Sequence, residues 1–215
     1  MGGMVSSPGN RRVRKQPEER REEILSAAAA IALAEGLERV TLRAVADRLG
    51  VRPGLITHYF PAAEDLVGAA FTRAADGERE QLFPADGDPL SRLRRFVEVI
   101  GGDESRDLSR LWLNARHLSR FSHVLDAAVI EQEARNDAGM VQLIQDGVAA
   151  GVFTADDPLR AGVRILMAVD GQSAYVNNTR GAGGAVYPDF VAETAEWTLG
   201  LRAGTLVPPP AEPAG

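Results

Sequence analysis

This sequence predicts an all-α protein of about nine helices. Apolar residues recur at helical spacing along most of the chain, and short breaks rich in proline, glycine and aspartate separate these segments. The 215 residues are 45% apolar, which is sufficient for a substantial core. Cysteine is absent, and no apolar run reaches roughly 18 residues. We therefore expect no disulfides, no membrane span, no cofactor and a cytoplasmic location.

Basic and acidic residues are distributed unevenly. The net charge of the chain is -6, but residues 1–60 carry ten basic against seven acidic side chains, a charge of +3 that leaves -9 for the remainder. Residues 1–16 are polar, glycine-rich and end near "RRVRK", which predicts a flexible basic arm. Such asymmetry is typical of a nucleic-acid-binding end joined to a different module.

The first helix is expected from about Pro17 to Glu35. Proline preorganises the first turn, and Glu18 and Glu19 face the positive end of the helix dipole. Gly36 follows the last apolar position and is a typical helix terminator.

Two short helices follow, separated by a tight turn. Thr41 is the expected N-cap of a helix that runs through Leu49, and Gly50 ends it in the left-handed conformation. Pro53 begins the next helix, at a position where its missing N–H costs nothing. This arrangement of a helix, a tight turn of about four residues and a second helix is the geometry that allows the second helix to enter a DNA major groove. The same pattern also occurs as ordinary core packing, so both interpretations stay open here.

The rest of the chain continues as helices separated by clear breaks. The expected segments are 62–76, 89–101, 105–119, 122–150, 157–178 and 188–203. The breaks include "PADGDP", "GVFTADDP" and "RGAGGAVYP", and the tail "PPPAEPAG" cannot pack.

The stretch "GLERVTLRAVADRLGVRPGLITHYFPAAEDL" resembles the DNA-binding segment of TetR-type transcriptional regulators, over roughly residues 17–70. The residues that carry the resemblance are Gly36, Thr41, Ala46, Gly50, Val51, Gly54, Tyr59, Phe60 and Leu66. It implies an all-helical homodimer whose first three helices bind a double-stranded DNA operator. The remaining helices would enclose a small-molecule effector and pair through the last two, and the effector usually releases the DNA.

The resemblance divides the chain into four expected regions. These are a basic arm (1–16), a helix-turn-helix DNA-binding domain (17–60), a helical effector-binding and dimerisation domain (61–204) and a disordered tail (205–215). Candidate DNA-binding residues are Thr41, Arg43, Arg52, Pro53, Gly54, Thr57, His58 and Tyr59. The hydroxyl groups of Thr41 and Tyr59 suit phosphate oxygens. The candidates for contacts with base edges are Arg43, Arg52, Thr57 and His58.

Three positions depart from the family pattern. Arg52 replaces a small hydroxyl residue that usually caps the third helix, Thr57 replaces a common tyrosine and Ala63 a common lysine. Two phosphate donors are thereby missing. We expect Arg52 and the basic arm to compensate for them, because arginine contacts to phosphates set affinity and its salt dependence.

Polar and aromatic residues in the C-terminal part are candidates for the effector pocket, which needs apolar walls and a few polar groups. They are Trp112, Arg116, Phe121, Asp170, Gln172 and Tyr175. Core packing with solvated surface residues explains the same set equally well.

An apolar stripe on the last helix, together with the helix before it, predicts half of a two-fold four-helix interface. Its members are Leu159, Val163, Leu166, Phe190, Thr194, Trp197 and Leu201. An intramolecular core is the alternative.

No catalytic motif is evident. There is no G-x-S-x-G elbow or phosphate-binding P-loop. His117 and His123 are six residues apart, a spacing that does not place them on one helical face, so we expect neither an enzyme nor a metal site. The favoured function is a ligand-responsive DNA-binding regulator, most often a repressor. The alternatives are an all-α enzyme or small-molecule carrier whose N-terminal helices only pack, and an interaction protein that contacts DNA without sequence preference.

Overall fold

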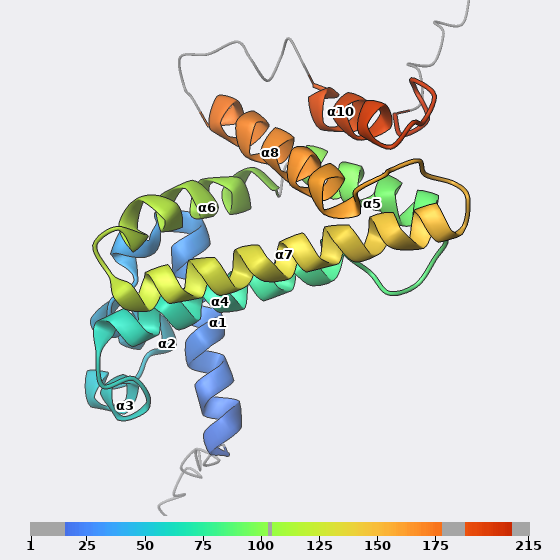
Figure 1. The fold of residues 1–215 in the computed structure, drawn as a ribbon. Helices are drawn as coiled ribbons and strands as arrows, with labels where there is room; N and C mark the ends of the chain where they lie inside the picture. Colours follow the sequence, from blue (N-terminus) through green and yellow to red (C-terminus); the bar gives the residue numbers. More distant parts are fainter. Residues whose placement is uncertain (1–15, 103–104, 178–187, 208–215) are drawn as a thin grey trace, which may run out of the picture.

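Nine α-helices and one short 3₁₀ helix make up the residues that the computed structural model describes, namely 16–102, 105–177 and 188–207, and no strand occurs in these ranges. The elements are α1 (Pro17–Glu35), η1 (Leu37–Arg39), α2 (Leu42–Leu49), α3 (Pro53–Tyr59), α4 (Ala63–Leu82), α5 (Pro89–Gly101), α6 (Ser105–Ser119), α7 (His123–Ala149), α8 (Pro158–Val176) and α10 (Phe190–Thr198) (Figure 1). The all-α prediction is confirmed.

The predicted helix boundaries were wrong at two places. α4 continues to Leu82 instead of ending at residue 76, because Glu78 and Leu82 are buried and tertiary packing outweighs the helix-weakening effect of Gly77. α10 ends at Thr198 instead of residue 203, since Gly200 takes a left-handed conformation (φ 67°).

The turn chemistry predicted for the first domain is confirmed. The Thr41 hydroxyl oxygen accepts a hydrogen bond from the Ala44 N–H (3.0 Å). Gly50 lies at φ 63° and ψ 35°, the left-handed region in which any side chain would be strained. Pro53 occupies the first turn of α3. These three residues fix the angle at which α3 leaves α2.

The buried residues form two separate clusters. One joins α1, α2, α3, the first part of α4, α6 and the start of α7, with Ile24, Ile56 and Phe71 among its fully buried members. The other joins α5, the second part of α7, α8 and α10 around Phe96 and Ile144. The long helices α4 and α7 pack side by side and pass through both clusters (Figure 1). None of the described helices is both long and apolar enough to span a bilayer.

Candidate DNA-binding surface and effector pocket

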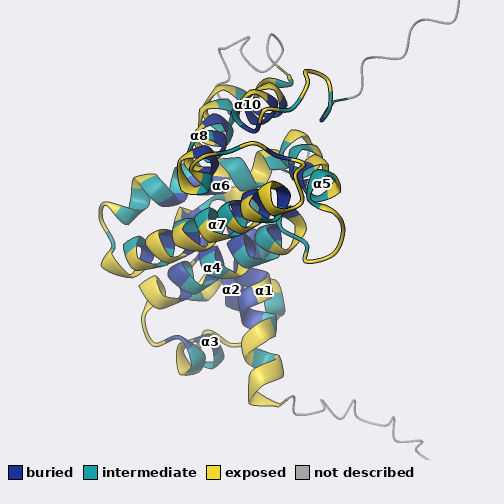
Figure 2. Ribbon diagram, turned by 45° about the vertical axis from the view of Figure 1, so that its right-hand side comes forward, coloured by how far each residue is buried: buried dark blue, intermediate teal, exposed yellow. Residues whose placement is uncertain are grey.

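Helix α3 buries one face and exposes the other. Ile56 is fully buried in the first cluster, and Phe60 directly after the helix is buried as well. The opposite side is open to solvent and carries the predicted DNA-contacting residues Arg52, Pro53, Gly54, Thr57 and His58. Figure 2 shows α3 at the end of the molecule that lies away from α8 and α10. An exposed short helix at an extremity is the arrangement that a DNA groove requires.

The remaining predicted DNA-binding residues flank this surface. Arg43 extends from α2 with 85% of its side chain exposed and forms only a loose ion pair with Asp47 (3.7 Å). The Thr41 side chain is engaged as the N-cap of α2, and Tyr59 is half-buried with the His58 ring at its edge (centroids 5.3 Å apart). These assignments remain predictions.

The hydroxyl group of Thr57 donates a hydrogen bond to the backbone carbonyl oxygen of Pro53 (3.2 Å). Its proton is therefore already used, while its methyl group and an oxygen lone pair stay available to a base edge. The predicted basic arm lies outside the described residues except for residue 16.

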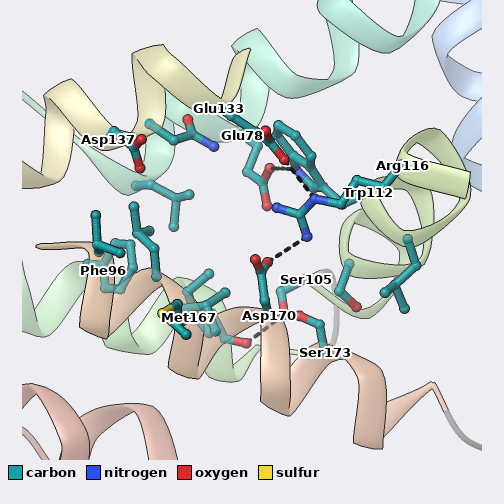
Figure 3. Close-up of a pocket in the computed structure, with 18 of the residues that line it drawn as sticks. Glu78, Phe96, Ser105, Trp112, Arg116, Glu133, Asp137, Met167, Asp170 and Ser173 are labelled. Carbon is teal, nitrogen blue, oxygen red and sulfur yellow. Dashed lines mark hydrogen bonds and ion pairs between the residues drawn. The ribbon is translucent and has the colours of Figure 1, made fainter. Parts of the chain in front are cut away.

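A partly open cavity of about 260 Å³ lies between the two buried clusters and is lined by residues of α4, α5, α6, α7 and α8. Its lining residues include Phe96 and Ile100 of α5, Trp112 of α6 and Leu166 of α8. Acidic and hydroxyl side chains share the wall with these apolar groups (Figure 3). Apolar walls with a few convergent polar groups are typical of a small-molecule site.

Half of the predicted effector residues meet in this cavity. Trp112, Arg116 and Asp170 line it, whereas Gln172 lines a separate, smaller hollow. Phe121 and Tyr175 are 76% and 62% exposed and do not line the cavity. The sequence placed Phe121 after α6 and the other five residues on the correct helices, but it did not determine which way their side chains point.

Arg116 is the central polar group of the cavity. Its Nε donates to Glu133 Oε1 (2.8 Å), its Nη1 donates to Asp170 Oδ1 (2.8 Å), and its guanidinium lies 5.4 Å from the centre of the Trp112 ring. Burial alone would lower the pKa of Arg116, but its hydrogen bonds and its attraction to both carboxylates raise it instead. The guanidinium therefore links α6, α7 and α8.

Glu78 projects from α4 into the same cavity and is 7% exposed. Its Oε2 accepts a hydrogen bond from the indole N–H of Trp112 (2.7 Å). Burial raises the pKa of Glu78, and this hydrogen bond offsets only part of the effect. The pKa of Asp137 is also raised, by burial first and then by repulsion from Glu133 and Asp170. Two carboxyl groups of the cavity are thus held in an environment that disfavours their charge.

Replacing Glu78 with glutamine is expected to stabilise the ligand-free protein at neutral pH. Because folding raises the pKa of this carboxyl group above its ordinary value of 4.5, the cost of burying its charge is absent below that value and complete above the folded-state pKa. Glutamine keeps an acceptor for the Trp112 indole. Thermal unfolding should show a gain of roughly 1 to 3 kcal/mol at pH 8 that disappears near pH 4, and an equal gain at both pH values would contradict this account.

Sequence reasoning missed three acidic residues of the cavity, namely Glu78, Glu133 and Asp137. For Glu78 a signal existed: it occupies a position in the buried stripe of α4 that also contains Phe71 and Leu82, where an apolar residue is expected. Glu133 and Asp137 gave no comparable signal, because acidic residues on a long helix are usually solvated. No group of residues suited to hold a metal ion occurs in the described part of the chain.

An apolar surface covers the outer side of α8 and α10. It consists of Leu159, Val163 and Met167, one turn apart on α8, and of Phe190 and Trp197 on α10, all between 40% and 73% exposed. We call this surface the α8–α10 face. The Arg164 guanidinium lies 4.9 Å from the centre of the Trp197 ring.

The predicted interface residues divide between this face and the interior. Leu159, Val163, Phe190 and Trp197 belong to the α8–α10 face, but Leu166 and Leu201 pack against the second buried cluster and Thr194 is half-buried. Val163 and Leu166 also line the cavity. The stripe predicted from the sequence therefore mixes inward and outward positions.

Comparison with known proteins places this architecture in a family. The model of the bacterial regulatory proteins of the tetR family matches residues 24–70. The chain is 31% identical over 149 residues to the HTH-type transcriptional repressor KstR2 of Mycobacterium tuberculosis, which covers 67% of this chain and 74% of that protein. It is 28% identical over 146 residues to KstR2 of Mycolicibacterium smegmatis, with 66% of this chain and 71% of that protein covered.

Solved structures show the same fold. A transcriptional regulator from Saccharomonospora viridis in complex with choline superposes with a TM-score of 0.71 at 21% identity, over 85% of this chain and 98% of that one. A TetR-family regulator from Rhodococcus sp. gives a TM-score of 0.66 at 23% identity, over 85% and 96%. The sequence resemblance is thus confirmed, and the chain belongs to the TetR family of bacterial transcriptional regulators, which are DNA-binding proteins and not enzymes.

Proposed function

We propose that the protein represses transcription by binding a palindromic operator as a two-fold homodimer, and that a small molecule in the cavity releases it from DNA. The observation that carries this proposal is the two-sided character of α3. Buried Ile56 anchors the helix while Arg52, Thr57 and His58 point outward. The names of the relatives, which are repressors, support the direction of regulation. Such a protein acts on DNA in the cytoplasm.

Helices α4 and α6 each connect the cavity to the DNA-binding domain. α4 begins at Ala63, directly after α3, and reaches the cavity at Glu78 and Leu82. α6 contributes Trp112 and Arg116 to the cavity. A ligand that displaces α4 or α6 therefore also displaces the residues against which the DNA-binding domain packs. A ligand-controlled switch requires such a difference in contacts between the ligand-bound and the ligand-free state.

A single asparagine on α6 holds the first domain directly. The Asn114 side chain accepts a hydrogen bond from the Leu37 N–H (2.9 Å) and donates one to Glu38 (2.9 Å). It lies between Trp112 and Arg116 in sequence, so the same helical turns contact both the cavity and η1. The connection between the cavity and the first domain is therefore short.

The α8–α10 face supports the dimer. An apolar surface spread over two adjacent helices is typical of a protein interface. It lies at the opposite end of the molecule from α3 (Figure 2). Pairing two copies through this face leaves both α3 helices free, and a two-fold protein reads a palindromic site.

We expect Arg52→Ala to weaken operator binding about 10-fold or more and to reduce the salt dependence of binding. Arg52 is exposed at the start of α3 and has no described hydrogen bond through its side chain. If each subunit loses one phosphate contact, the slope of log affinity against log salt should fall by about two units. Fluorescence anisotropy at several salt concentrations measures both quantities.

Arg202→Ala is the matched control, because Arg202 is also exposed but follows α10 at the other end of the molecule. Both variants remove one positive charge per chain. Only the first should change the slope. Identical slopes for the two variants would show that Arg52 does not replace the missing phosphate donors.

The proposed function as a whole is tested by footprinting next to the gene of the protein. A protected palindrome that becomes accessible when a small molecule is added supports the proposal. Equal binding to any duplex would favour an interaction protein without sequence preference, and release by no ligand would leave the cavity without a regulatory role.

A further inference from the structure

The charge of the cavity wall is strongly one-sided. Glu78, Glu133, Asp137 and Asp170 line the cavity, and Arg116 is the one cationic side chain among its described lining residues. Figure 3 shows that these carboxylates come from α4, α7 and α8 and surround the same hollow. With all groups ionised the wall carries a charge of -3. A cation that enters the cavity would offset part of the repulsion among these carboxylates.

Arg116 compensates only part of this charge. It pairs with one oxygen each of Glu133 and Asp170. Glu78 Oε1 and both oxygens of Asp137 have no hydrogen-bond or ion-pair partner within the described residues. Burial raises the pKa of Glu78, and burial together with repulsion from Glu133 and Asp170 raises the pKa of Asp137. A positive charge close to either carboxyl group would oppose these shifts. The unpaired oxygens are hydrogen-bond acceptors that face the cavity.

Most of the remaining residues of the cavity wall are apolar or carry hydroxyl groups, so they suit the uncharged part of a ligand. Leu82, Phe96, Ile100 and Leu166 form an apolar region, and Ser105, Ser109 and Ser173 add hydroxyl groups. The Trp112 ring already carries the Arg116 guanidinium and packs edge-to-face with Phe71 (4.9 Å between centroids). Phe83 and Phe96, the other two aromatic residues of the wall, pack against each other (5.6 Å between centroids). Acceptor oxygens, more than free aromatic faces, are therefore available to a cation. This suits an ammonium group with N–H donors better than a quaternary one.

We infer that the cavity binds a small organic amine in its protonated form, with the ammonium group on Glu78 and Asp137 and an apolar body against α5 and α8. This inference rests on the proposed function, because it names the chemical class of the effector. A volume of about 260 Å³ restricts the ligand to a small molecule.

The inference is tested with four probes that carry the same six-carbon chain. n-Hexylamine, n-hexyltrimethylammonium, n-hexanol and n-hexanoate share an apolar chain and differ in the head group. Thermal unfolding and calorimetry of the full chain without DNA at pH 7.5 should show binding of n-hexylamine at least about 10-fold tighter than of the neutral alcohol. Hexanoate should give no shift. Equal shifts with the alcohol, a larger shift with hexanoate, or the same shift with calcium chloride would overturn the inference.

Two isosteric variants locate the ammonium group. Glu78→Gln and Asp137→Asn each remove one negative charge from the wall, and each should weaken n-hexylamine binding at least about 10-fold. Glu80→Gln is the matched control, because Glu80 lies exposed on α4 outside the cavity. Unchanged binding in both cavity variants would overturn the assignment. Tighter binding of the quaternary probe than of n-hexylamine would overturn the role of the carboxylates as hydrogen-bond acceptors.

Operator release separates this inference from the proposed function. If n-hexylamine binds but leaves the operator complex intact, the chemical class of the ligand stands and the regulatory role of the cavity fails. If it does not bind while a different class of molecule releases the operator, the inference fails and the proposed function stands.

Discussion

Introducing glutamate at both Leu159 and Trp197 is expected to yield a monomer of 23.0 kDa and to weaken operator binding at least about 100-fold. These side chains are 57% and 73% exposed on the α8–α10 face, one on each helix. The carboxylate at position 159 would be buried in an apolar interface without a described partner, which costs several kcal/mol, and the one at position 197 would add a charge beside Arg164. A monomer contacts one half-site only, so it loses the gain in affinity that a second, linked half-site provides. Sedimentation velocity at micromolar concentration and gel shift with the full operator measure the two effects.

Phe121→Glu is the matched control for this variant. Phe121 is 76% exposed, but it lies at the turn between α6 and α7 and not on the α8–α10 face. Charge at this position should leave the dimer intact. A double variant that remains dimeric would show that the protein pairs through another surface, whereas a monomer with full operator affinity would contradict the two-fold reading of DNA.

The DNA-binding domain was predictable because its signals are local. Thr41, Gly50 and Pro53 act through the backbone within a few residues of their own positions, so their chemistry determines the turn wherever the domain packs. The exposure of α3 followed from the same pattern, since Ile56 is the apolar residue that a helix of seven residues needs to face the core.

The cavity was less predictable because it depends on side-chain direction across five helices. Trp112 and Arg116 were recognised from their spacing of one turn, but the acidic partners of Arg116 come from α7 and α8, which the sequence does not place in contact. Glu78 lies beyond residue 76, where the predicted helix ended, so it was not recognised as part of a buried helix face. Burial of residues on both sides of Gly77 is a tertiary effect that local helix propensity does not contain.

Ile56→Ala is expected to abolish specific operator binding while the cavity stays folded. Ile56 is completely buried (0% exposed to solvent), and it is the one buried residue within α3. Its truncation costs about 2 to 5 kcal/mol. A helix of seven residues has no stability of its own in water, so it depends on this anchor. The variant should lose operator affinity at least about 100-fold in anisotropy measurements, because α3 is no longer held in a fixed orientation.

Ile144→Ala distinguishes loss of the anchor from general destabilisation. Ile144 is equally buried, but it lies on α7 in the second cluster, away from α3. Both variants should unfold at a lower temperature by a similar amount, because the same number of methylene groups is removed from a packed environment. Below the unfolding transition only the Ile56 variant should fail to bind the operator. If both variants bind equally well, α3 keeps its orientation without Ile56, and the anchoring role of this residue is contradicted.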